Sequence, residues 1–329
     1  MGAAEFTAPE VTGPASGYMP EETADFGSAV WELFRNVVGT LRPDLREAAA
    51  ICMSLIATVL LISLVQGLGD SSKKTANLTG TAAISAALLL SANSMIQLGS
   101  ETIQKLCEYG KLLLPVMTAA MAAQGSATAS AALYTGTALF IALLSGLISK
   151  LLLPMVYMYL ALSAANSATG ESMLKRMGDL LKWVMSWCLK TVVTVFTGYL
   201  GITGIISGTT DAAMVKAAKT AISTAVPVVG GALSSAAESV LAGAALVKNA
   251  AGIYGILAVL AIFLEPFLRI GIHYLMLKIT SAVTGIFGCK EMTDLIGSFS
   301  EAMGFLLAMT GSVCVLMLIS TVCFLKGVG

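Results

Sequence analysis

The stretch that decides the fold is residues 112–149, LLLPVMTAAMAAQGSATASAALYTGTALFIALLSGLIS, because it contains no Asp, Glu, Lys or Arg. A second uncharged stretch, residues 151–170, follows after the single residue Lys150. About 20 consecutive apolar residues in a helix are enough to cross the hydrocarbon core of a bilayer. These two stretches therefore predict two or three membrane crossings.

The rest of the chain has the same character. Its 329 residues are 57% hydrophobic and 12% charged, and the mean hydropathy is +0.86. Soluble domains carry about 25% charged residues, which they need to cover an apolar core. The sequence therefore predicts an all-α, polytopic transmembrane protein, with room for roughly seven to ten spans of bilayer length.

Composition and motifs also argue against several functions. The net charge of +0 gives no basic surface for nucleic acid, so no nucleic-acid partner is expected. His273 is the only histidine, which excludes a multi-histidine metal site. The chain contains no GxxxxGK[ST], HExxH or GxSxG motif, and its cysteines lie singly, as small apolar residues do. We therefore expect no enzymatic activity, no cofactor and no metal.

Changes in charge along the chain divide it into four parts. Residues 1–47 are acidic and then basic, and predict a soluble, partly amphipathic lead that begins without the pattern of a signal peptide. Residues 48–100 hold the first transmembrane helices. Residues 101–208 and 209–329 form two membrane repeats.

Two charged segments are expected to separate membrane spans. Residues 101–111 alternate Glu and Lys and predict a connector after the second span. Residues 171–190 mix charge with Trp183 and Trp187 at helical spacing, which predicts an interfacial helix. Its basic residues favour the cytoplasm, and the contrast with the acidic segment 289–302 favours inverted halves. An external N-terminus leads instead to four crossings in each half, and this count slightly favours parallel halves.

Four prolines indicate an internal duplication. Pro115 and Pro154 are separated by the same number of residues as Pro227 and Pro266. Pro115 and Pro227, the latter followed by Gly230 and Gly231, are candidate helix breaks, and broken helices often line the functional axis of duplicated membrane proteins. The alternative is a kinked helix that packs closely through Gly and Ala. Both interpretations stay open.

A few polar residues within the apolar stretches are candidates for function. Glu265, Arg269 and His273 recur at every fourth position, so they share one helical face. Charges at bilayer depth are usually paired or functional, and we expect Glu265 and Arg269 to pair inside the protein, with partial rescue by a charge swap. The alternative places Glu265 at an interfacial turn and Arg269 among the headgroups. Lys248 either lines a polar seam between the halves or snorkels to the interface.

A known family shows the same features in the same order. They are Gly17-Tyr18-Met19-Pro20, Pro227-Val228-Val229-Gly230-Gly231 with Glu238, Lys248-Asn249-Ala250-Ala251-Gly252, and Glu265-Pro266. In these the chain resembles the stage III sporulation protein AE family of endospore-forming bacteria, from about residue 17 to 326.

The resemblance implies a membrane component of the secretion-like channel complex that joins mother cell and forespore. It places the protein in the mother-cell membrane surrounding the forespore. The implied partners are the other membrane proteins and the ATPase of that complex and, indirectly, the forespore-side protein. The family has no catalytic residues to transfer, and its precursors typically begin with a cleavable signal.

Two main functions fit these observations. The first is an assembly or conduit subunit, whose work is done by packing against lipid and partner proteins. The second is a secondary transporter with a site at the interface of the two repeats, for which Glu265, Arg269 and Lys248 are the polar candidates. A purely structural anchor is a third, and homo-oligomerisation is left open.

Overall fold

The computed structural model describes residues 8–11, 13–20, 26–67, 70–123, 127–202 and 250–328. Every regular element in these ranges is a helix, which confirms the all-α class. In chain order they are η1 (Pro14–Tyr18), α1 (Phe26–Thr40), α2 (Arg42–Gln66), α3 (Asp70–Ala123), α4 (Ala127–Leu147), η2 (Ile148–Leu152), α5 (Leu153–Thr169), α6 (Ser172–Ile202), α9 (Ala250–Thr284), η3 (Gly285–Phe287) and α10 (Lys290–Val328).

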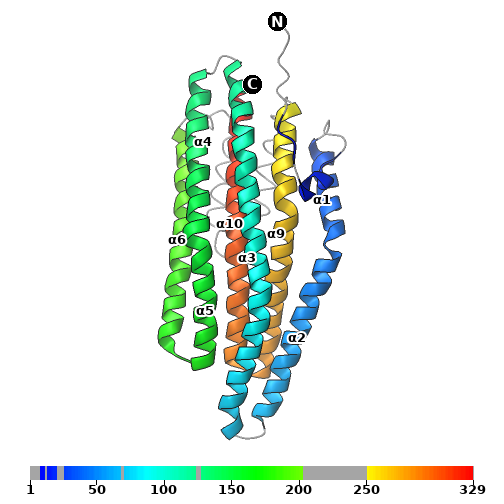
Figure 1. Ribbon diagram of the computed structural model, residues 1–329, viewed down its shortest axis with the longest axis vertical. Helices are drawn as coiled ribbons and strands as arrows, with labels where there is room; N and C mark the ends of the chain where they lie inside the picture. Colours follow the sequence, from blue (N-terminus) through cyan, green and yellow to red (C-terminus); the bar gives the residue numbers. More distant parts are fainter. Residues whose placement is uncertain are drawn as a thin grey trace.

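The long helices stand side by side in an upright bundle (Figure 1). The pairs α2–α3, α5–α6 and α9–α10 are hairpins that all turn at the lower end of the bundle as drawn. The first helix of each pair therefore descends and the second ascends. The α5–α6 and α9–α10 hairpins correspond in the predicted duplication, and their common direction is the one that parallel halves require. The duplication itself stays a prediction.

Five of the described helical stretches are long and apolar enough to cross a membrane. They are Arg42–Gln66, Thr75–Ala123, Ser130–Thr169, Gly252–Phe287 and Lys290–Leu325. This confirms the polytopic membrane class within the described part of the chain. The pattern of residues 171–190 predicts an interfacial helix, which would lie flat. These residues instead form the lower part of the upright helix α6, beside α5 (Figure 1).

Helix α3 differs most from the expectation. It is 54 residues long and continues through residues 101–111, so the predicted connector does not form. At 1.5 Å per residue such a helix is about 81 Å long, far more than the ~30 Å of a bilayer core. Part of α3 must therefore extend beyond the hydrocarbon. The helix also crosses the division placed at residue 100, and the four-part domain scheme stays a prediction.

The prolines sit in helices in two different ways. Pro115 lies inside α3 and Pro266 inside α9, and both helices continue past them. Pro154 lies in the first turn of α5, directly after the π-helical turn η2. A proline inside a helix clashes with the carbonyl four residues before it, and a widened turn relieves this clash. The remaining candidates Lys248, Pro227, Gly230 and Gly231 lie outside the described residues.

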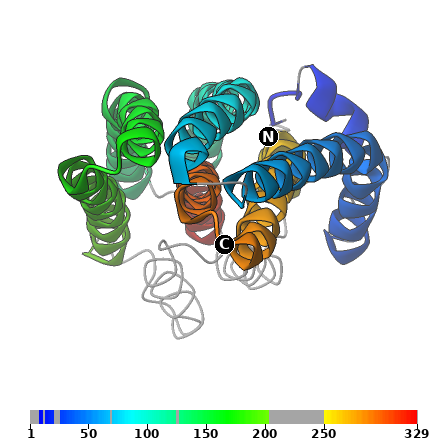
Figure 2. The same cartoon turned by 90° about the horizontal axis from the view of Figure 1, so that it is seen from below.

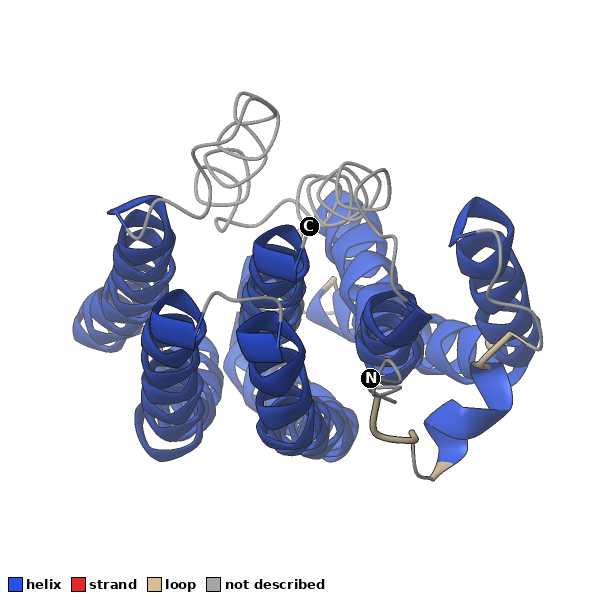
Figure 3. Ribbon diagram, turned by 90° about the horizontal axis from the view of Figure 1, so that it is seen from above, coloured by secondary structure: helices blue, strands red, loops and turns tan. Residues whose placement is uncertain are grey.

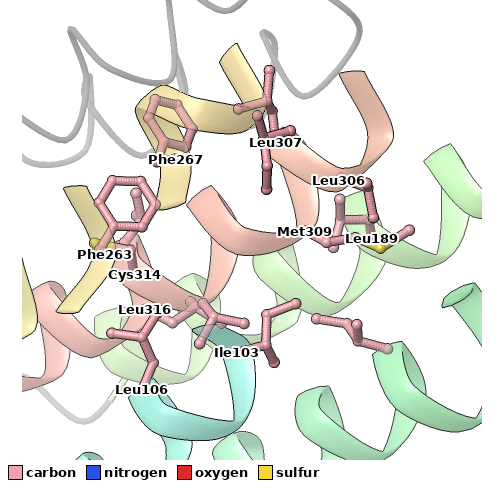
Figure 4. Close-up of a cluster of buried hydrophobic side chains, with 14 of the residues drawn as sticks. Ile103, Leu106, Leu189, Phe263, Phe267, Leu306, Leu307, Met309, Cys314 and Leu316 are labelled. Carbon is pink, nitrogen blue, oxygen red and sulfur yellow. The ribbon is translucent and has the colours of Figure 1, made fainter. Parts of the chain in front are cut away.

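Helix α10 forms the centre of the bundle, between α3 and α9 (Figures 2 and 3). In an 18-residue apolar window of its candidate span 78% of the residues are buried, against 22% in such a window of α2. Large apolar side chains from α3, α6 and α9 surround it, among them Ile103, Leu189, Phe263 and Phe267 (Figure 4). The end views place α5 and α6 at one edge of the described bundle and α1 at the other.

Candidate functional site

The predicted polar residues of α9 meet a third charged residue from α2. Arg269 Nη1 lies 3.2 Å from Glu265 Oε1, one turn earlier on α9, and Arg269 Nη2 lies 2.6 Å from Asp44 Oδ1. One guanidinium thus bridges two carboxylates from helices far apart in the sequence. The Asp44 side chain is 13% exposed and that of Arg269 is 34% exposed, so the group is partly buried.

Asp44 reaches this position because α2 begins where it does. Pro43 stands in the first turn, where a missing N–H costs nothing, and Asp44 follows in the same turn. A carboxylate there interacts favourably with the positive end of the helix dipole. Asp44 falls within the predicted soluble lead, and its contact with Arg269 was not among the predicted ones. The signal was present, since a proline followed by an acidic residue is typical of a helix start.

Apolar contacts between α1 and α9 lie next to this group. Leu33 and Val37 of α1 and Ala261 and Leu264 of α9 form a small buried cluster. Leu264 directly precedes Glu265, so this cluster packs α1 against the segment of α9 that carries the charged group. The Asp44 and Glu265 side chains are only 13% and 21% exposed, so their interaction with Arg269 is stronger than it would be between fully exposed side chains.

His273 lies one turn beyond Arg269 and is buried. Its Nδ1 is 3.2 Å from the backbone oxygen of Arg269, so its polar contact is made within its own helix. The Nε of Arg269 is buried without an acceptor among the described residues. We call Asp44, Glu265, Arg269 and His273 the α2–α9 junction.

A second charged group joins the α5–α6 hairpin to α10. Lys182 Nζ of α6 lies 3.1 Å from Glu301 Oε2 of α10 and 2.9 Å from Asp179 Oδ1 of its own helix. The hydroxyl of Tyr159, on α5, donates a 2.8 Å hydrogen bond to the same Glu301 oxygen. Tyr159 is buried, so its hydroxyl needs such a partner. We call Tyr159, Asp179, Lys182 and Glu301 the α6–α10 junction.

The α6–α10 junction keeps Lys182 charged. Burial by itself lowers the pKa of this ammonium group, but its hydrogen bond to Asp179 and the charge and hydrogen bond of Glu301 outweigh that effect. The pKa of Lys182 therefore lies above its ordinary value, and the ion pair persists across the physiological pH range.

Sequence reasoning missed the α6–α10 junction. Asp179 and Lys182 are three residues apart, a spacing that indicates a pair on one helix. Glu301 and Tyr159 lie far from both in the sequence, and no local spacing connects them. Only the packing of the α5–α6 hairpin against α10 brings the four side chains together.

Both junctions fasten helices and offer little for chemistry. Among the described residues no group of three or more His, Cys, Asp or Glu side chains could hold a metal ion. The six cysteines are free, and all except the half-buried Cys188 are buried, as apolar packing requires. What the arrangement does is fix the position of α9 and α10 relative to α2 on one side and α6 on the other.

Comparisons with known proteins cover nearly the whole chain. The family model described as stage III sporulation protein AE matches residues 19–327. The curated protein "Stage III sporulation protein AE" of Bacillus subtilis (strain 168) is 24% identical over 237 residues, which are 71% of this chain and 59% of that relative. The match thus spans less than two thirds of the relative's length. No solved structure matches this chain.

Proposed function

This chain belongs to the stage III sporulation protein AE family, and on that premise we propose that it is an assembly or conduit subunit of the channel complex between mother cell and forespore. Family membership gives the protein a role in sporulation, and the candidate spans make it a membrane protein. The proposal adds its place, the mother-cell membrane around the forespore. It also adds its partners, the other membrane proteins and the ATPase of the complex and, indirectly, the forespore-side protein.

The observation that carries the proposal is that partly buried charged residues connect helices to one another. In the α2–α9 junction Arg269 bridges Asp44 and Glu265, and in the α6–α10 junction Lys182 bridges Asp179 and Glu301. Each group ties together segments that lie far apart in the sequence. Such contacts support a protein that acts through its shape and its protein contacts, and a non-enzymatic role is consistent with the family.

The transporter alternative needs polar groups that are available to a substrate at the interface of the two repeats. Of its three candidates, Lys248 lies outside the described residues, and Glu265 and Arg269 are engaged with each other and with Asp44. A substrate would have to displace Asp44 or Glu265 from the guanidinium, and breaking either ion pair costs about 1–3 kcal/mol. The assembly proposal requires no such exchange.

A deletion experiment tests the proposal. The gene is deleted in the sporulating host, and each remaining membrane protein of the complex is located by a fluorescent tag. Loss of their co-localisation around the forespore is expected, with recovery when the wild-type gene is restored. Complete assembly without this protein would reject the assembly role. Assembly together with failed sporulation would favour transport by this chain.

A further inference from the structure

One side of α6 carries a row of exposed apolar residues, which we call the α6 stripe. It consists of Met173, Met177, Leu180, Trp183, Trp187 and Val195. The rings of Trp183 and Trp187 lie one turn apart and stack, with their centroids 6.4 Å apart. The residues of the stripe are exposed, and α6 lies at the edge of the described bundle (Figures 2 and 3).

Helix α2 shows how a lipid-facing stripe looks in the same protein. Its exposed apolar residues include Met53, Leu61 and Leu64, and no charged residue lies between Glu47 and Asp70. Among the described residues, α2 is one of the five candidate spans, whereas Ser172–Ile202, the described extent of α6, is not. A bilayer could cover the α2 stripe without enclosing any charged residue.

The α6 stripe differs because charged residues interrupt it. Arg176 is exposed between Met173 and Leu180, three or four residues from each, and therefore lies within the stripe. Lys190 borders its upper part, three residues beyond Trp187. Arg176 and Lys190 are about 21 Å apart along the helix, which is less than the ~30 Å of the hydrocarbon core. A bilayer that covered the tryptophans would therefore also enclose a cation, at considerable cost.

Three cations of α6 lie beyond ion-pair distance of any carboxylate in the described part of the chain. Lys175, Arg176 and Lys190 form no ion pair there, whereas Lys182 on the same helix has two carboxylate partners. Trp, Met and Arg are also the residue types enriched in protein interfaces. A surface of this composition fits a partner that supplies both apolar side chains and carboxylates.

We propose that the α6 stripe is the docking surface for an upright helix of another membrane protein, whose apolar face covers Trp183 and Trp187 and whose carboxylate pairs with Arg176. The inference rests on the proposed function, because it names the place where a subunit of the complex attaches. The upright direction follows from α6 itself, which stands parallel to α5 and α10 (Figure 1). The docked helix would cover the exposed apolar side chains of α6, as α3 and α9 cover those of α10.

Spin labels distinguish a protein cover from lipid or water. Leu180→Cys on α6 and Leu61→Cys on α2 are made in a Cys188→Ala background and labelled with a nitroxide. The chain is placed in phosphatidylethanolamine–phosphatidylglycerol vesicles, alone and as the co-expressed complex. We expect the label at 61 to collide with oxygen in both samples. The label at 180 should collide with oxygen or with a water-soluble nickel chelate in the chain alone. In the complex it should be shielded from both.

Each other outcome for the label at 180 overturns the proposal. If its oxygen collisions in the complex equal those at 61, the stripe faces lipid. If the nickel chelate reaches it in the complex, the stripe faces water. If it is already shielded in the chain alone, this chain or a second copy of it covers the stripe.

The charge of the partner is tested at Arg176. Arg176→Glu should lower the recovery of the other tagged membrane proteins of the complex about tenfold, as expected when an interface arginine meets a carboxylate. Arg176→Lys should keep most of the recovery, and Arg46→Glu, an exposed charge reversal on α2, should keep all of it. All three variants should accumulate like the wild type. Unchanged recovery with Arg176→Glu rejects an acidic partner.

Failure of this inference can be told from failure of the proposed function. If the complex assembles without the whole chain, the proposed function fails. If deletion prevents assembly but the double variant Trp183→Ala/Trp187→Ala assembles normally, only the docking surface is wrong. Loss of assembly with the double variant, at normal accumulation of the chain, supports both.

Discussion

The α9–α10 and α5–α6 hairpins have the same form but different environments. Each descends, turns and ascends, and each turn contains a glycine with positive φ, Gly170 at 72° and Gly288 at 78°. In 18-residue apolar windows of the candidate spans of α9 and α10, 72% and 78% of the residues are buried, against 39% in such a window of the span that contains α5. The same supersecondary element thus serves as the core of the bundle in one case and as its edge in the other.

The two hairpins also depend on apolar packing to different degrees. The α9–α10 hairpin packs through large apolar side chains such as Phe267 and Phe299, which are almost completely buried. The α5–α6 hairpin adds polar contacts to its packing, because Tyr157 donates a 2.9 Å hydrogen bond to Asn93 of α3 and Lys182 pairs with Glu301. The comparison teaches that an edge hairpin with an incomplete apolar contact is fixed by a few specific polar ones.

The largest effect should come from opening the core of the central hairpin. Phe267→Ala removes a buried ring and should lower the free energy of unfolding by about 3–5 kcal/mol. Trp183→Ala on the edge hairpin removes an exposed ring and should change it by less than about 0.5 kcal/mol in the isolated chain. Denaturant midpoints in a mild detergent measure both. Similar destabilisation by the two variants would abolish the distinction between core and edge.

The next effect concerns the ion pairs that fix the central hairpin to α2. Arg269→Ala leaves Asp44 and Glu265 without their cation; the fully buried case costs about 3–5 kcal/mol, and the partial exposure of Arg269 reduces this to about 2–3. Asp44→Ala should cost less, and Glu265→Ala least, because Asp44 is the closer and more shielded partner. Unfolding midpoints of the three variants give the order, and equal destabilisation by all three would contradict it.

Asp44 also changes what a charge swap should do. From the sequence alone, exchanging Glu265 and Arg269 should restore stability in part, since the pair remains on one helical face. In the structure the swap would place a carboxylate at position 269, opposite Asp44. The Oδ1 atom of Asp44 now lies 2.6 Å from Nη2 of Arg269, so two negative charges would face each other. We therefore expect rescue only when Asp44→Lys is added to the swap.

A smaller effect is expected at the junction that holds the edge hairpin. Glu301→Ala leaves the Tyr159 hydroxyl without its acceptor and Lys182 with Asp179 alone, which should cost about 1–2 kcal/mol. Asp294→Ala, an exposed change on the same helix, is the matched control and should have no measurable effect. A double variant Lys182→Ala/Glu301→Ala completes the cycle. An interaction energy near zero would mean that packing alone holds the α5–α6 hairpin.

How much of the fold and of the two junctions can be predicted from the sequence depends on how far apart in the chain the interacting residues lie. The membrane class follows from uncharged stretches such as 112–149, because hydropathy needs no knowledge of packing. The pairing of Glu265 with Arg269 can be predicted because both lie on one helix, four residues apart. The contacts of Arg269 with Asp44 and of Lys182 with Glu301 join distant segments, and a single sequence carries no trace of them.

The charged residues 101–111 show the opposite difficulty. Glu101, Lys105, Glu108 and Lys111 predict the end of a span, but they are exposed on the outer face of α3, and Glu101 and Lys105 approach to 4.0 Å. Glu and Lys are good helix formers, and pairs four residues apart stabilise a helix slightly. Charge marks where a helix leaves the lipid, and it does not mark where the helix ends.

The last prediction tests whether core and edge hairpins point the same way across the membrane, and its readout is labelling, not stability. Asp179 of α6 and Asp294 of α10 are exposed near the turns of their hairpins, and both turns lie at the same end of the bundle (Figure 1). Asp179→Cys and Asp294→Cys are made singly in the Cys188→Ala background, where the remaining cysteines are buried. A membrane-impermeant maleimide should then label both positions from the same side, in intact protoplasts or in inverted vesicles, with labelling in detergent as the control for reactivity. Labelling of the two positions from opposite sides would mean inverted halves, and it would show that equivalent hairpins in one bundle face different compartments.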